Sequence, residues 1–253
     1  MVVPLLGIPV LNRGDLLARC LDSIDYPVER IVIINNGTDE TVEASIARAA
    51  KIHANLEAIR PPSNLGVAAS WNYFLRHYDA AFHVVCGSDI QFAPGDIEKI
   101  ATFVTRRPHH AIVFGNHGYS LFALTRLGLD LVGYFDENFY PAYLEDCDHF
   151  YRVTLLHGHS ADVPGLAALH GEAPHWGSST ILSDPVLRRW NAITHTNNFT
   201  YYRAKWGGLN GEETYIHPFN DPSRSPRDWI LDHDFRQAAL ASQLVVGPYV
   251  QAI

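Results

Sequence analysis

Two acidic sites in the sequence have residue types that suit ligand chemistry. Asp89 follows the apolar residues 82–86 and the small Gly87-Ser88 pair. A carboxylate beside residues that leave room for a ligand suits a hard divalent cation bound together with phosphate oxygens and water. The second site is Glu145-Asp146-Cys147-Asp148, which has three carboxylates in four residues next to an aromatic segment. One carboxylate is enough to cap a helix and offset its dipole. The cluster therefore favours a functional role, with helix capping as the alternative.

The apolar runs of the sequence predict the strands that position these acids. The runs do not alternate with polar residues, which is typical of a parallel sheet covered by helices on both faces. Strands are expected at residues 2–10, 30–34, 56–59, 82–86, 111–114, 118–124 and 161–169. Helices are expected from Asp15 as the capping residue, over 40–52, after the turn at 64–66, over 94–105, from Glu145 to about 157, over 185–206 and over 228–244. The predicted class is α/β with a mostly parallel central sheet. Ligands of such sheets bind at the carboxyl ends of the strands, so Asp89 is expected at the mouth of a crevice.

Composition limits the classes of protein to which the chain can belong. Its 253 residues are 47% hydrophobic and 18% charged, as in a globular protein. The formal net charge of −8, without a run of Lys or Arg, argues against general binding to DNA, RNA or anionic membranes. No stretch approaches the roughly 18 apolar residues of a membrane span. We expect one catalytic domain over residues 1–182, with a helical and irregular C-terminal extension over 183–253 packed on it.

The cysteines and the N-terminus indicate the compartment. Cys20, Cys86 and Cys147 are scattered and odd in number, which predicts neither a disulfide framework nor a zinc site. The apolar N-terminus contains Pro4 and Pro9 and lacks a basic leader, so we interpret it as a core strand and not as a signal peptide. A cytoplasmic protein is the expectation.

Several motifs occur in a fixed order along the chain. They are the strand ending in Asn12-Arg13, Asn35-Asn36-Gly37-Thr38, Asn64-Leu65-Gly66-Val67 with Asn72, Gly87-Ser88-Asp89, and Gly133-Tyr134-Phe135-Asp136-Glu137 followed by Glu145-Asp146-Cys147-Asp148. Over residues 2–179 this order resembles the family 2 glycosyltransferases, which have the GT-A fold, and the last motif is the most specific match. The chain departs from the family pattern at two positions. Asn35 stands where the family has the acid that meets the nucleobase, and Gly87 stands where it has the first acid of Asp-x-Asp.

The resemblance implies a role for each matching residue. Asp89 and His170, with His175 as the fallback for the latter, would hold a divalent metal, Mn²⁺ or Mg²⁺, at the donor diphosphate. Asp146 would be the general base, with Glu145 beside it in the catalytic site. Donor contacts are expected from Pro9, Asn12, Asn35, Gly37, Asn64, Gly66, Asn72 and Ser88. Contacts with the sugar or the acceptor are expected from Tyr143, Asp148, Trp176 and Lys205.

The function that the resemblance implies is inverting transfer of a sugar from a nucleotide-sugar donor to an acceptor hydroxyl. The acceptor is expected to be a saccharide, a lipid-linked glycan or another hydroxyl compound. One alternative is a glycosyltransferase that acts on a modified nucleic-acid base or on a protein. A second is an inactive module that binds nucleotides or sugars, which the missing acid at Gly87 favours. A nucleotidyltransferase is disfavoured, because the N-terminal loop is not rich in glycine and lysine is scarce.

Overall fold

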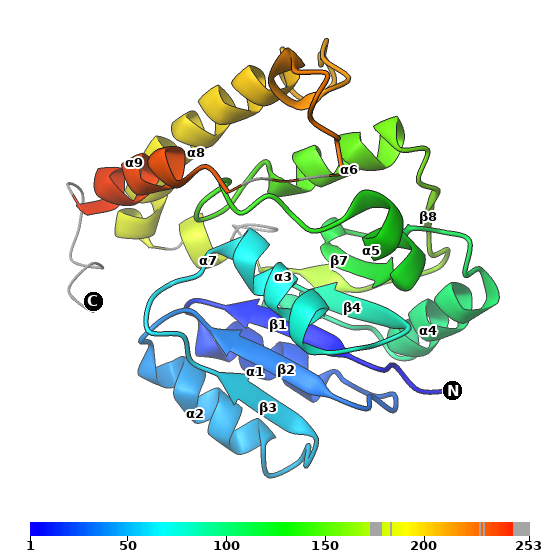
Figure 1. Cartoon of the computed structure of the whole chain (residues 1–253). Coiled ribbons are helices and arrows are strands. Elements are labelled where there is room, and N and C mark those ends of the chain that lie inside the picture. The colour runs from blue at the N-terminus through cyan, green and yellow to red at the C-terminus, as the bar shows by residue number, and fades with distance from the viewer. Residues whose placement is uncertain (173–178, 183, 228, 230, 245–253) are drawn as a thin grey trace.

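A seven-stranded sheet forms the centre of the protein (Figure 1). The computed structural model describes residues 1–172, 179–182, 184–227, 229 and 231–244. The strand order is β3-β2-β1-β4-β7-β6-β8. The strands are β1 (Leu6–Val10), β2 (Ile31–Asn35), β3 (Leu56–Ile59), β4 (Phe82–Cys86), β6 (Ile112–Gly115), β7 (Gly118–Thr125) and β8 (Ser160–Asp162). Strands β3, β2, β1 and β4 are parallel, whereas β7 runs antiparallel to both β4 and β6. The predicted α/β class with a mostly parallel sheet is confirmed.

Helices cover both faces of the sheet. The apolar cluster on one face contains side chains of α1 (Gly14–Asp22), α2 (Glu40–Ala49) and α4 (Asp96–Arg106). The cluster on the other face contains side chains of α3 (Val67–His77), α5 (Arg126–Val132) and α6 (Glu145–Leu155). Alternation along each strand divides the side chains between the faces: Ile31 and Ile33 belong to the first cluster, Val32 and Ile34 to the second.

The strand expected at 161–169 is two short strands. β8 ends at Asp162, and β9 (Leu169–His170) pairs antiparallel with β5 (Ile90–Gln91) in a separate two-stranded sheet. The intervening residues include Pro164, which cannot donate a ladder hydrogen bond, and Gly165, which has a positive φ of 71°. This break carries the chain across to the end of β4 and places His170 opposite Ile90.

Three of the helices that differ from the sequence prediction are α1, α5 and α9. Asp15 does not cap α1: the N-cap is Arg13, in the left-handed region at φ 61°, and Asp15 lies in the first turn. Helix α5 was not expected, and Gly128 lies inside it. There, a Cβ atom would come within 2.1 Å of the Ala111 carbonyl oxygen, so glycine permits close packing of helix on strand. The last helix, α9 (His233–Leu244), begins five residues later than expected.

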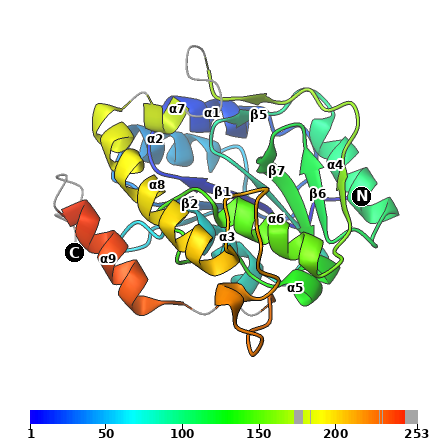
Figure 2. The same ribbon diagram turned by 90° about the horizontal axis from the view of Figure 1, so that it is seen from above.

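The C-terminal part of the chain packs on α6 and on the aromatic loop before it. It contains α7 (Ser179–Leu182), α8 (Pro185–Trp206), the short helix η1 (Pro218–Asn220) and α9. Figure 2 shows α8 crossing the molecule diagonally beside α6. The predicted division at residues 182–183 falls between α7 and α8 and stays a prediction. None of the described helices combines the length and apolar character needed to cross a membrane.

A buried ionic network joins α8 to α6 and the loop. Lys205, in the last turn of α8, forms ion pairs with Asp136 and with Asp148, and all three side chains are almost fully buried. Asp148 also accepts hydrogen bonds from Arg152 Nε at 2.9 Å and from Trp206 Nε1 at 2.8 Å. Burial alone would raise the pKa of Asp148, but the charges of Lys205 and Arg152 outweigh it and hold that pKa below its ordinary range.

Replacing Lys205 by methionine should destabilise the protein by about 3–5 kcal/mol, because two buried carboxylates lose their shared counter-ion. Chemical denaturation monitored by fluorescence measures the change. Arg203→Met is the matched control, since Arg203 lies on the same helix but is exposed. Equal stability of the two variants would show that the network does not hold α8 in place.

Candidate active site

A cavity of about 1280 Å³ opens at the carboxyl ends of β1, β2 and β4. The start of α3, the β6–β7 hairpin, the loop before α6, and residues of α7, α8 and α9 form its other walls. We call this cavity the crevice. The predicted site residues that line it are Pro9, Gly37, Asn64, Gly66, Ser88, Asp89, Tyr143, Glu145 and Asp146. Motifs that precede and follow the β6–β7 hairpin in the sequence thus contribute residues to the same cavity.

Two glycines of the crevice wall allow neighbouring backbone segments to pack closely together. A Cβ atom on Gly37 would lie 1.8 Å from the Leu11 carbonyl oxygen, which leaves no room for a side chain. Gly66 has a φ of 79° and caps α3 without a side-chain hydrogen bond. Its backbone lies against Pro141, whose carbonyl oxygen accepts a hydrogen bond from Val67 N at 2.7 Å. The α3 N-terminus is therefore held directly against the loop that precedes α6.

Asp89 and His170 form a potential metal-binding pair at the end of β4. The Asp89 Oδ1 atom lies 3.3 Å from His170 Nε2, because the β5–β9 pairing brings the two segments together. A Cβ atom on Gly87 would lie 2.9 Å from Asp89 Oδ1, so a side chain at position 87 would have to displace this carboxylate. Among the described residues, no group of three His, Cys, Asp or Glu side chains is placed to hold a metal ion. One carboxylate and one imidazole fit a divalent ion that takes its other ligands from phosphate oxygens and water.

Glu145 and Asp146 begin α6 after a turn with unfavourable backbone angles. Tyr143 and Leu144 have φ values of 79° and 73°, in the left-handed region that residues other than glycine seldom adopt. The buried Asn198 of α8 donates hydrogen bonds to the carbonyl oxygens of Ala142 at 2.8 Å and Tyr143 at 3.1 Å. Strained backbone persists only where its surroundings enforce it, and here α8 supplies that support.

The two acids differ in their surroundings. Glu145 is buried, and its Oε2 atom has no hydrogen-bond partner among the described residues. Burial, reinforced by the negative charge of Asp146, raises the pKa of Glu145 well above its ordinary value of 4.5. The protonated carboxyl group is therefore favoured. Asp146 is half-buried on the crevice wall, and its Oδ1 accepts a hydrogen bond from Cys147 N at 2.8 Å.

Some predicted site residues lie outside the crevice. Asp148 and Lys205 are enclosed in the ionic network, so the structure assigns them a packing role and not the predicted acceptor contacts. Asn72 is also buried: it accepts from Phe135 N and donates to Phe135 O, both at 2.8 Å. Its side chain therefore secures the loop after α5 and is not placed to reach a donor. Trp176 and His175 lie outside the described residues.

The other two asparagines face neighbouring elements. The Asn12 side chain donates to the Thr180 carbonyl oxygen at 3.1 Å. Asn35 donates to Glu43 of α2 at 2.7 Å, and the next residue, Asn36, lines the crevice instead. Side chains alternate along β2, so Asn36 shares the face of Ile34 and α3 and donates to Ser70 Oγ at 2.9 Å. The sequence prediction missed Asn36, although the alternation of side chains along β2 could have identified it.

Aromatic and histidine side chains of the crevice were missed. Trp71 and Tyr119 line it and stack with a ring-centroid separation of 6.2 Å. The Tyr119 hydroxyl lies 2.8 Å from Nδ1 of the buried His149, which fixes the ring. His117, on the β6–β7 hairpin, also lines the crevice. The hairpin reaches this site only through antiparallel pairing of β7 with β4, which local sequence patterns do not reveal.

Comparison with known families identifies the chain. The model of the family described as glycosyl transferase family 2 matches residues 6–149. The chain belongs to this family. A curated relative, a galactofuranosyl glycosyltransferase of Leishmania donovani, is 23% identical over 328 residues, covering 93% of this chain and 75% of the relative.

Solved structures share the fold of this family 2 protein. The mannosyltransferase PcManGT from Pyrobaculum calidifontis, in complex with GDP-Man and Mn²⁺, matches with a TM-score of 0.60 and 16% identity, over 98% of this chain and 76% of that one. S. aureus TarS 1-349 in complex with UDP-GlcNAc matches with a TM-score of 0.56 and 15% identity, over 76% of this chain and 66% of that one. The fold is therefore GT-A, as the sequence resemblance implied.

The buried Glu145 predicts a dependence of stability on pH. Above pH 4.5 the unfolded chain releases the Glu145 proton while the folded protein, with its raised pKa, retains it. This group should therefore reduce stability as pH rises, by up to about 1.4 kcal/mol per pH unit until the raised pKa is reached. Glu145→Gln removes the effect, so the variant should gain stability relative to wild type as pH increases.

Unfolding free energies measured from pH 5 upward test this prediction. Glu98→Gln, at an exposed position of α4, controls for the loss of a surface carboxylate. Parallel curves for wild type and Glu145→Gln would contradict the prediction.

Proposed function

We propose that the protein transfers a sugar from a nucleotide-sugar donor to an acceptor hydroxyl, with inversion at the anomeric carbon. One observation carries this proposal: the Asp89–His170 pair reaches the crevice through Asp89, and Glu145 and Asp146 line the same crevice. One pair suits a diphosphate with its counter-ion, and the other suits hydroxyl groups. Family membership supports sugar transfer, and similar structures hold GDP-Man with Mn²⁺ or UDP-GlcNAc.

The donor nucleotide would lie over the carboxyl ends of β1 and β2. Gly37 is half-buried and adds no side chain to this wall, and Asn36 and Asn64 line the part of the crevice where a nucleobase or ribose would lie. Pro9 and Ser88 complete the wall on the side of β4. The diphosphate would then point toward Asp89.

Asp89 and His170 would hold a divalent ion, Mn²⁺ or Mg²⁺, at the diphosphate. When bound, such an ion neutralises the charge that grows on the leaving diphosphate. Ser88 lies next to Asp89 on the same wall and offers a hydroxyl donor to a phosphate oxygen.

Asp146 would act as the general base. Its carboxylate accepts the proton of the acceptor hydroxyl as the oxygen attacks the anomeric carbon from the face opposite the leaving diphosphate. Glu145, protonated and with an unpartnered oxygen, would donate a hydrogen bond to a sugar hydroxyl and orient the ring. Tyr143 and Trp71 would supply ring faces for the sugar at this end of the crevice.

Release of free sugar from UDP-sugars and GDP-sugars, with Mn²⁺ or Mg²⁺ present, tests the role of Asp146 without a known acceptor. The variant Asp146→Asn should lower kcat by roughly 10²–10⁴-fold, as expected for loss of a positioned base. The donor Kd should change little, because Asp146 would contact the acceptor side.

Asp162→Asn is the matched control, since Asp162 is exposed on β8 and lies away from the crevice. If wild type and Asp146→Asn hydrolyse every donor at equal rates, Asp146 is not the base. If wild type neither binds nor hydrolyses any donor, the proposed activity itself is wrong.

A further inference from the structure

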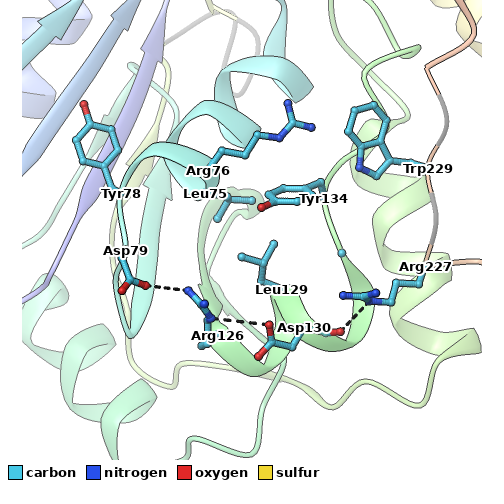
Figure 3. A pocket seen from close by; sticks show the side chains of 11 residues that line it. Leu75, Arg76, Tyr78, Asp79, Arg126, Leu129, Asp130, Tyr134, Arg227 and Trp229 are labelled. Atoms are coloured by element: carbon cyan, nitrogen blue, oxygen red, sulfur yellow. Dashed lines mark hydrogen bonds and ion pairs between the residues drawn. The ribbon is translucent and has the colours of Figure 1, made fainter.

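A second cavity, of about 560 Å³, is shown in Figure 3; it lies at the amino end of β4, whereas the crevice lies at the carboxyl end of that strand. We call it the distal pocket. Tyr78 and Asp79, which precede β4, line one side, and Arg126, which follows β7, lines the next. Its volume is within the roughly 300–1,000 Å³ of pockets that bind small ligands. None of the residues assigned to catalysis or to the donor lines it.

Helix α3 connects the two cavities. Its first residue, Val67, lines the crevice, and Arg76, near its other end, lines the distal pocket. At a rise of 1.5 Å per residue the two positions are about 14 Å apart along the helix axis. The distal pocket is thus near the crevice but separate from it.

Carboxylates and guanidinium groups alternate along the lower rim of the distal pocket, as Figure 3 shows. Arg126 Nη1 lies 2.8 Å from Asp79 Oδ1, and Arg126 Nε lies 3.8 Å from Asp130 Oδ1. Arg227 Nε donates to the Asp130 carbonyl oxygen at 2.8 Å. A sugar hydroxyl both donates and accepts hydrogen bonds, so a rim that offers acceptors and donors in turn suits a polyhydroxylated ligand.

Aromatic rings form the upper wall. The Arg76 guanidinium lies 4.7 Å from the ring centroid of Tyr134 and 5.0 Å from that of Trp229. Arg76 also pairs with Glu137 at 3.0 Å, so its charge is already compensated. In Figure 3 the Tyr134 ring lies between Arg76 and Leu129, at the edge of the open space. Such rings combine an apolar face with a polar tip, as contact with a sugar ring requires.

The segment that carries Arg227 forms one wall of the distal pocket and is held in place by close backbone packing. Gly133 has a φ of 85°, and a Cβ atom there would lie 2.9 Å from the Arg227 carbonyl oxygen. This close approach and the Arg227–Asp130 hydrogen bond fix the segment that carries Arg227 against α5. The terminal nitrogens of Arg227 contact no acceptor among the described residues and remain available to a ligand.

We propose that the distal pocket binds an anionic saccharide, a sugar that carries a carboxylate or a phosphate. The alternating rim would bind the hydroxyl groups, and Tyr134 would contact the ring. The negative charge is assigned to Arg227 because guanidinium groups pair with carboxylates and phosphates through two parallel hydrogen bonds. Among the arginines that line the pocket, Arg76 is paired with Glu137 and Arg126 with Asp79 and Asp130, which leaves Arg227 as the guanidinium group to bind an added negative charge. The inference does not depend on the proposed transferase activity.

Isothermal titration calorimetry of the full chain with glucose 6-phosphate and with glucuronate tests the proposal. Arg227→Gln should weaken binding of at least one of these probes by about tenfold or more, because a hydrogen-bonded charge pair is lost. Arg106→Gln is the matched control, since it removes the same charge from an exposed position at the end of α4. Asp89→Ala, in the crevice, should leave this binding unchanged.

Comparison ligands separate the saccharide from other occupants. Tyr134→Leu should weaken binding of the sugar probe but not of inorganic phosphate, and neutral glucose should bind at least tenfold more weakly than the charged sugars. Inorganic phosphate binding as tightly as glucose 6-phosphate would reduce the pocket to an anion site and overturn the proposal. Tighter binding of UMP at Arg227 would indicate a nucleotide site and also overturn it. So would the absence of saturable binding by either sugar probe, or an unchanged Kd in Arg227→Gln.

Discussion

The buried ammonium group of Lys205 is the interaction on which the active-site geometry depends. It lies between the carboxylates of Asp136, in the loop after α5, and Asp148, in α6. Each carboxylate would be unfavourable in the interior without this partner. The network therefore fixes the last turn of α8 against α6. A second contact of α8, from Asn198 to the turn at Tyr143, then holds the strained backbone that directs Glu145 and Asp146 into the crevice.

The part of the crevice that contains Asp89 is positioned by strand pairing. β4 ends at Cys86 in the parallel part of the sheet, and the antiparallel β5–β9 pair returns His170 to the same point. Gly87 leaves the space that the Asp89 carboxylate occupies. The absence of a first acid in this motif is thus compatible with a metal site in which a histidine from a distant segment is the second protein ligand.

Sequence patterns predicted the positions of the acids better than the surroundings of the polar residues. The rule that ligands bind at the carboxyl ends of parallel strands placed Asp89 in a crevice, and the structure has it there. Asn35 was assigned to the donor although β2 alternation turns its side chain toward α2. Asp148 and Lys205 were expected to meet an acceptor, but they neutralise each other in the interior. Their pairing spans 57 residues of chain, and no local pattern encodes a contact between elements so far apart.

The most direct test of the account is the thermal stability of the protein with a panel of nucleoside diphosphates, each with and without Mn²⁺ or Mg²⁺. A ligand that binds only the folded state raises the apparent Tm as its concentration exceeds Kd. We predict stabilisation by one nucleoside diphosphate that requires the metal and is lost in Asp89→Ala. If no nucleotide shifts the Tm under any metal condition, or if the shift persists in Asp89→Ala without metal, the crevice is not the metal-assisted donor site described here.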